Sequence, residues 1–86
     1  MRESAIEKYL IRKVKEWGGE LRKVKWLGRD GAPDRRVMLP WRRVWVELKA
    51  TGKKLAPHQE REHKRMKKYG EDVIVIASFE DVDALK

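Results

Sequence analysis

Two short alternating segments, residues 35–39 and 44–49, constrain the fold more than any other part of the chain. Apolar and polar side chains alternate in both, which is typical of strands that cover a core with one face. The turn-forming residues 40–43 separate the segments, so we expect a β-hairpin. If Leu39 faces Val44, and therefore Val37 faces Val46, one face of the hairpin is apolar along both strands.

The same register gathers charged side chains at the open end of the hairpin. It places Arg36 opposite Glu47 and Asp34 opposite Lys49. Because successive side chains of a strand point to opposite faces, Glu47 and Lys49 share one face. We therefore expect Asp34, Glu47 and Lys49 to lie close together.

The rest of the chain shows the periods of further helices and strands. The predicted elements are a helix over residues 3–17 ended by Gly18 and Gly19, a weak strand over 21–27, the hairpin, a helix over 57–69, a strand over 73–76 and a short helix over 79–85. The first three strands can form an antiparallel meander, and the crossover through the second long helix makes the last strand parallel to a neighbour. We expect an α/β fold of αβββαβ order, with a small mixed sheet flanked by helices and residues 1–86 forming a single domain.

The charge of the chain indicates a polyanionic partner. The net charge is +8 and the pI is about 10.0, which favours nucleic acid. Because 42% of the residues are charged, few side chains remain for a core. Either the domain is marginally stable alone, or a second subunit supplies part of the burial.

Other classes of protein are disfavoured by what the sequence lacks. The absence of cysteine excludes disulfides and thiolate zinc sites. No apolar run approaches the length of a membrane span and the N-terminus has no secretory signal, so we expect an intracellular protein without membrane contact. An interfacial membrane protein is disfavoured because the first helix has no apolar face to spare after core packing.

Asp34, Glu47 and Lys49 are residue types that can cut a phosphodiester bond. Mg²⁺ accepts one or two carboxylates and keeps several waters, and Asp34 and Glu47 would be that pair, with the backbone carbonyl of Leu48 as a third oxygen. Lys49 would then orient the attacking water and stabilise the transition state. The alternative is structural, because Arg36 and Lys49 can neutralise the two carboxylates as surface ion pairs.

Three short motifs in this chain resemble the virus-type replication-repair nuclease family, VRR-NUC, of the PD-(D/E)xK nuclease superfamily. They are Gly31-Ala32-Pro33-Asp34, Trp45-Val46-Glu47-Leu48-Lys49 and Ala56-Pro57-His58-Gln59. The resemblance extends from about residue 3 to residue 76 and implies a restriction-endonuclease-like core of the same αβββαβ order. It also implies that Asp34 and Glu47 bind the metal, that Lys49 is the catalytic lysine, and that Gln59 helps to hold the metal-bound water or the lysine.

The resemblance further implies an acidic residue on the first helix near the metal. Glu7 and Glu3 both lie on the apolar stripe of that helix. Glu7 is eleven residues before Gly18, a spacing similar to that in archaeal Holliday junction resolvases, so we favour Glu7, acting directly or through a water. Alternatively, both acids only oppose the helix dipole.

Basic and aromatic residues outside these motifs are candidates for DNA contacts. The expected phosphate contacts are Lys53, Lys54, Arg35, Lys64, Lys67 and Lys68. For Arg35, and for Arg42 and Arg43 as further candidates, a solvated loop is an equally good interpretation. Trp26, Trp41 and Trp45 are candidates for stacking on bases, although Trp17 and at least one of these are expected in the core or a dimer contact. His58 and His63 point to different sides of a helix, which excludes a zinc pair; His63 is expected on the sheet-facing stripe beside Gln59 and Met66.

The function that we predict is a Mg²⁺-dependent, structure-selective DNA endonuclease, with Mn²⁺ as a substitute and no small-molecule cofactor. Small members of the resembled family come from phages and bacteria and resemble nucleases that cut four-way (Holliday) junctions as dimers. We therefore expect a homodimer in a bacterial or phage-infected cytoplasm. A non-catalytic DNA-binding module and a nicking or restriction-type subunit remain alternatives.

Overall fold

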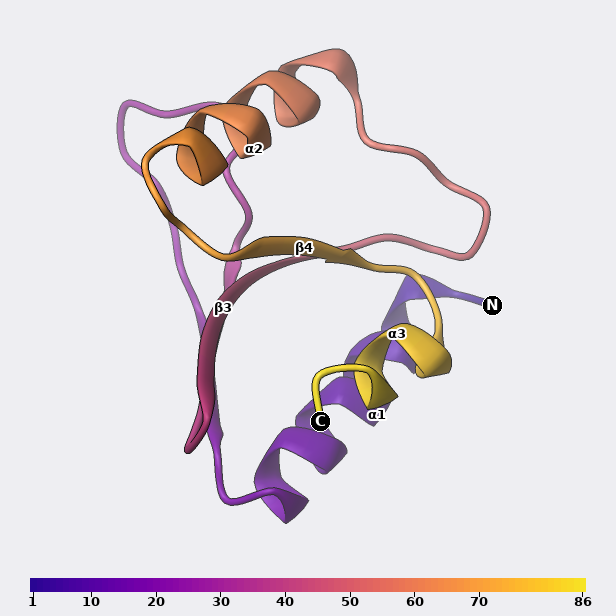
Figure 1. Cartoon of the computed structure of the whole chain (residues 1–86). Coiled ribbons are helices and arrows are strands. Elements are labelled where there is room, and N and C mark those ends of the chain that lie inside the picture. The colour runs from indigo at the N-terminus through magenta and orange to yellow at the C-terminus, as the bar shows by residue number, and fades with distance from the viewer.

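The computed structural model describes residues 1–86 and contains three helices and one four-stranded sheet (Figure 1). The elements are α1 (Glu3–Glu16), β1 (Glu20–Lys23), β2 (Arg35–Leu39), β3 (Arg42–Leu48), α2 (Pro57–Lys68), β4 (Val73–Ile76) and α3 (Phe79–Asp83). The predicted α/β fold and its αβββαβ order are confirmed, with α3 as a short addition. The helices are too short or too polar to span a membrane.

The sheet has the predicted mixed topology. Its strand order is β1-β2-β3-β4; the first two pairs are antiparallel, and β4 runs parallel to β3. The parallel pairing follows from the crossover through α2, which returns the chain to the starting edge of β3. Figure 1 shows α1 and α3 side by side on one face of the sheet and α2 on the other.

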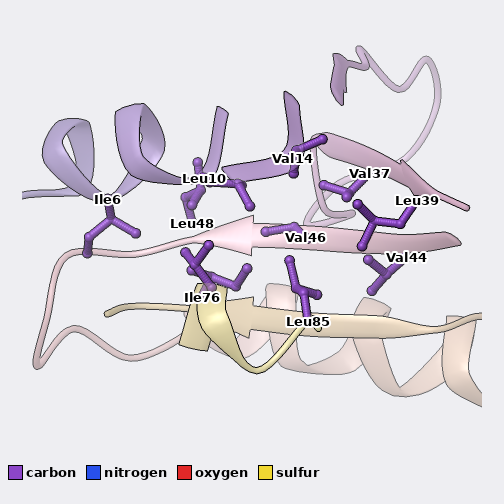
Figure 2. Close-up of a cluster of buried hydrophobic side chains, with 11 residues drawn as sticks. Ile6, Leu10, Val14, Val37, Leu39, Val44, Val46, Leu48, Ile76 and Leu85 are labelled. Carbon is purple, nitrogen blue, oxygen red and sulfur yellow. The ribbon is translucent and has the colours of Figure 1, made fainter. Parts of the chain in front are cut away.

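The core lies between the sheet and the layer formed by α1 and α3. Ile6, Leu10 and Val14 occur at helical spacing on α1, and all three are buried. Figure 2 shows them against the apolar side chains of the central strands and of Ile76 and Leu85. Each such side chain contributes about 1.5–3 kcal/mol through burial, so this layer holds the sheet to α1.

The predicted hairpin exists, but its register differs from the prediction. Leu39 pairs with Arg42 and Val37 pairs with Val44, because the chain reverses through a two-residue turn at Pro40 and Trp41. The shift is two residues, so every side chain keeps its predicted face and the apolar face stands. The shift does change the charged end of the hairpin. The last pair of the register is Arg35 with Val46, so the next residues, Asp34 and Glu47, lie opposite each other, and Asp34 no longer faces Lys49.

The first strand is shorter than its alternation predicted. It ends at Lys23 instead of residue 27, and only one further ladder-like bond follows, from the Val24 N–H to the Asp34 carbonyl at 3.0 Å. The next aromatic residue, Trp26, donates its indole N–H to the Pro33 carbonyl at 2.8 Å. Residues 24–34 therefore form a loop that returns to β2 and is closed on itself at its base.

Candidate active site

Asp34, Glu47 and Lys49 lie on the face of the sheet that α2 covers. Asp34 immediately precedes β2 and its side chain is 53% exposed, whereas the Glu47 side chain in β3 is only 12% exposed. Lys49 follows β3, and its backbone N–H extends the parallel pairing by donating to the Ile76 carbonyl at 3.0 Å. The face alternation of β3 therefore aims Glu47 and Lys49 to the same side.

Glu47 carries two opposing electrostatic influences. Burial, followed by the charges of Asp34 and Glu3, raises the pKa of Glu47 to about 7 from an ordinary 4.5, while Lys49 and Arg35 act to lower that pKa. The carboxylate is thus destabilised by desolvation and by like charge. A cation bound between Asp34 and Glu47 would relieve both effects.

His63 of α2 packs over Glu47. Its Nε2 lies 3.7 Å from Glu47 Oε1, and the imidazole is 4% exposed. Burial, with Lys67 as the next cause, lowers the pKa of His63, so the ring is neutral and makes no ion pair at neutral pH. The prediction that His63 faces the sheet is correct, but the Nε2 atom has no hydrogen-bond partner in the protein.

Arg35 is not the exposed phosphate contact that was expected. Its side chain is 8% exposed because it occupies a core-facing position of β2, in alternation with Val37. Its Nε donates to Glu7 Oε2 at 2.9 Å, and its Nη1 lies 2.9 Å from Asp34 Oδ1. Arg35 therefore joins the carboxylate of the first helix to the carboxylate of the Gly-x-Pro-Asp motif.

The two candidate acids of α1 take different positions. Glu7 is bound to Arg35, whereas Glu3 is exposed and its charge acts on Glu47. The choice of Glu7 as the residue near the metal thus stays a prediction, and it requires Arg35 to release or share the carboxylate.

Gln59 lies in the first turn of α2, half-buried. Its side-chain oxygen accepts a hydrogen bond from the Ala56 backbone N–H at 2.9 Å, which satisfies a backbone donor just before the helix begins. That oxygen therefore has a structural role, and the side-chain NH₂ group of Gln59 can donate to a water. Lys49 is itself a donor, so Gln59 can meet it only through the second lone pair of the same oxygen.

Gly31 brings the loop before Asp34 against α2. It has φ +80°, and a Cβ atom at this position would lie 2.7 Å from the carbonyl oxygen of His58. Only glycine allows both the left-handed backbone and this approach. With Pro33 fully buried, the Gly-x-Pro segment anchors Asp34 beside the N-terminal half of α2.

The available ligands match a hard cation held mainly by water. No three side chains of the types His, Cys, Asp and Glu converge on one metal-sized position. The two carboxylates of Asp34 and Glu47 with a backbone oxygen such as that of Leu48 are a ligand set that suits Mg²⁺, which retains several waters. A closed zinc site, which needs four protein ligands, does not fit.

An open basic hollow of about 450 Å³ lies directly beside Asp34. Its lining residues are Lys23, Val24, Lys25, Trp26, Arg29, Gly31, Ala32, Asp34 and Arg35. Sequence reasoning did not single out Lys23, Lys25 or Arg29 among many basic residues; the available signal was their concentration in a segment that contains no acid. The other predicted phosphate contacts, Lys53, Lys54, Lys64, Lys67 and Lys68, are all exposed.

Two comparisons with known proteins, one of structure and one of sequence, point to the same family. No family model matches the chain. A solved structure described as a VRR_NUC domain is 42% identical, with a TM-score of 0.85, and the match covers 96% of this chain and 91% of that one. "Putative nuclease p44" of Acyrthosiphon pisum secondary endosymbiont phage 1 is 46% identical over 79 residues, which are 91% of this chain and 85% of the phage protein. The chain belongs to the VRR-NUC family.

Proposed function

We propose that this chain is a metal-dependent endonuclease that hydrolyses phosphodiester bonds in DNA. The observation that carries the proposal is the grouping of Asp34, Glu47 and Lys49 at one end of the sheet, beside a basic hollow, in a member of the VRR-NUC family. The Asp34 side chain is open to solvent, so a cation held there can reach a phosphate, whereas the Glu47 carboxylate is largely shielded from water.

Asp34 and Glu47 would hold Mg²⁺, with the Leu48 carbonyl as an additional oxygen and Mn²⁺ accepting the same ligands. When bound, the ion would supply a nucleophilic water and compensate charge on the phosphoryl oxygens. The raised pKa of Glu47 supports this assignment, because a buried carboxylate next to a second carboxylate is stabilised by a divalent cation.

Lys49 would act on the reacting phosphate. Its ammonium group orients the attacking water and stabilises charge that develops on the phosphoryl oxygens. Gln59 would assist by donating from its side-chain nitrogen to the water or by accepting from the lysine with its side-chain oxygen, and Glu7, or Glu3 in its place, would meet the metal through a water. Lys53, Lys54, Lys64, Lys67 and Lys68 would bind the backbone on either side.

The favoured substrate is a four-way DNA junction cut by a homodimer. A two-fold dimer presents two active sites, which matches the near two-fold symmetry of a four-way junction. The chain itself supports dimerisation, because only 16 of its 86 residues are buried and burial of this extent gives a marginal core.

The test is a cleavage assay on a labelled four-way junction beside a linear duplex and a flap, with Mg²⁺, with Mn²⁺ and with EDTA. We expect paired cuts in opposing arms that need the metal and that disappear in Asp34→Ala protein of verified fold. Sequence-selective cutting of the linear duplex would instead indicate a restriction-type subunit. Tight DNA binding without cleavage of any substrate would show a non-catalytic module.

A further inference from the structure

Leu27 is the most exposed large apolar residue of the chain, with 87% of its surface accessible. It lies in the loop of residues 24–34 that joins β1 to β2. A single exposed leucine needs no explanation in itself. This one differs because its neighbours are fixed to the body of the protein and because cations surround it.

The loop on both sides of Leu27 is anchored. The Trp26 indole donates to the Pro33 carbonyl at 2.8 Å, and its ring centre lies 5.0 Å from that of Trp45 on β3. Arg29 forms an ion pair of 3.6 Å with Glu62 of α2. Figure 1 shows this loop beside α2. Leu27 thus lies between two residues that are tied to the rest of the protein, while its own side chain stays in solvent.

The charges near Leu27 favour a polyanion, rather than a second copy of the chain, as the partner that contacts this residue. Residues 21–29 contain four cations and no acid. Lys23, Lys25 and Arg29 line the hollow of about 450 Å³ that ends at Asp34. Two copies meeting through this loop would bring like charges together, whereas a phosphodiester backbone would be attracted to it.

We propose that Leu27 is a wedge that stacks on a base pair left open at a break in the DNA stack, next to the phosphate positioned at Asp34. Lys25 and Arg29 bind the phosphates on either side of the break. This inference rests on the proposed nuclease function and adds a determinant of substrate structure to it.

The physical reason for selectivity is the cost of unstacking. Inserting an apolar side chain into a continuous duplex must first break the stacking of a base step. At a branch the step is already open, so burying Leu27 is favourable from the start. The wedge therefore favours branched DNA, whereas the lysines favour every DNA substrate equally.

The test compares Leu27→Ser with Leu27→Met, which keeps an apolar tip. Ile11→Ser is the matched control, because Ile11 is another exposed apolar residue (47%) but lies on α1. Cleavage rates are measured on a branched junction and on a linear duplex. We expect Leu27→Ser to lower the rate on the junction about tenfold and to leave the duplex unchanged, with Leu27→Met and Ile11→Ser within twofold of the parent. Lys25→Ala should lower both rates equally.

A second readout does not depend on cleavage. In a Lys49→Ala background, 2-aminopurine placed in the base pair at the branch reports the environment of that base. We expect its fluorescence to change on binding, and the change to be absent with Leu27→Ser. Equal losses on both substrates, an unchanged fluorescence response, or conversion of a dimer to a monomer by Leu27→Ser would overturn the wedge.

The two readouts separate the wedge from the nuclease proposal. If the parent protein binds the junction with the fluorescence change but cuts nothing, the nuclease proposal fails and the wedge stands. If the parent cuts the junction and Leu27→Ser cuts it at the same rate, the wedge fails alone. Absence of any DNA binding would overturn both.

Discussion

Glu47 lies where burial and neighbouring carboxylates oppose its negative charge. Asp34 and Glu3 act in the same direction as burial, and Lys49 and Arg35 offset them only in part. In a protein that binds a divalent cation here, such a carboxylate is an energetic cost of the metal-free state. The cost should be measurable as a dependence of stability on pH.

We predict that Glu47→Gln changes this pH dependence in the metal-free protein. Because the pKa of Glu47 is raised from 4.5 to about 7, the native state keeps a proton that the unfolded chain has released between these values. The free energy of unfolding contributed by Glu47 therefore falls as pH rises through this window. The lowered pKa of His63 has the opposite effect below its ordinary 6.5, where the unfolded imidazole takes up a proton first.

Thermal unfolding between pH 5 and 7.5 with EDTA tests the prediction. The melting temperature of Glu47→Gln should rise with pH relative to the parent, since only the His63 contribution remains. Glu60→Gln, a change of an exposed carboxylate on α2, should leave the parent profile unaltered. Parallel profiles for Glu47→Gln and the parent would contradict the assigned cause.

Substitution of Lys49 should affect catalysis and leave DNA binding nearly unchanged. Lys49→Ala removes the ammonium group that would orient water and stabilise the phosphoryl oxygens, so we predict a loss of cleavage of at least about 100-fold. Junction affinity should change less than about threefold, because many other exposed cations remain available to bind the DNA backbone. Gel-shift binding beside single-turnover cleavage measures both, with Lys53→Ala as the control that weakens binding and retains cleavage. Loss of binding in folded Lys49→Ala protein would refute the catalytic role.

At the level of elements, the site depends on how the loop of residues 24–34 packs on α2. Gly31 passes so close to His58 that a Cβ would meet a backbone oxygen at 2.7 Å, and Gly52 has a similar positive φ with nothing within 4 Å. Both positions therefore need a residue that tolerates positive φ, but only Gly31 also needs the space that a Cβ would fill. Substituting alanine at each position distinguishes the cost of backbone strain from the cost of the lost contact with α2.

We predict that Gly31→Ala costs about 2 kcal/mol or more in the free energy of unfolding and that Gly52→Ala costs about 1 kcal/mol. The difference arises because the Gly31 variant must also move the loop away from α2. Urea unfolding measures both values. At temperatures where each variant is folded, Gly31→Ala should lose most cleavage, since Asp34 moves with the loop, and Gly52→Ala should keep it. Equal effects at the two positions would show that the contact with α2 does not position the site.

For the whole molecule, the balance between charge and core predicts self-association. The core consists of only eleven buried apolar residues in a chain with net charge +8, and exposed apolar side chains remain at Trp41 and Val75. We predict a species of twice the chain mass of 10.2 kDa in light scattering, with a melting temperature that rises with protein concentration. A monomer whose melting temperature is independent of concentration would exclude an obligate dimer.

The sequence alone determined the order of the elements, the faces of the apolar side chains in the hairpin and the residues of the motifs. These depend on periods of 2 and 3.6 and on turn residues, which act over a few neighbours. For this reason a register error of two residues in the hairpin left Val37, Val44 and Val46 on the core face. The basic charge and the family motifs are likewise readable without coordinates.

The tertiary structure alone decided which charged groups meet. The length of the turn at Pro40 put Asp34 opposite Glu47 rather than Lys49. Arg35 meets Glu7, 28 residues away, and no local pattern records a partner at that distance. The loop that carries Leu27 is likewise held by contacts with distant segments, from Trp26 to Trp45 and from Arg29 to Glu62. Local periodicity determines the face of an element on which a side chain lies, and packing between distant segments determines which groups that side chain contacts.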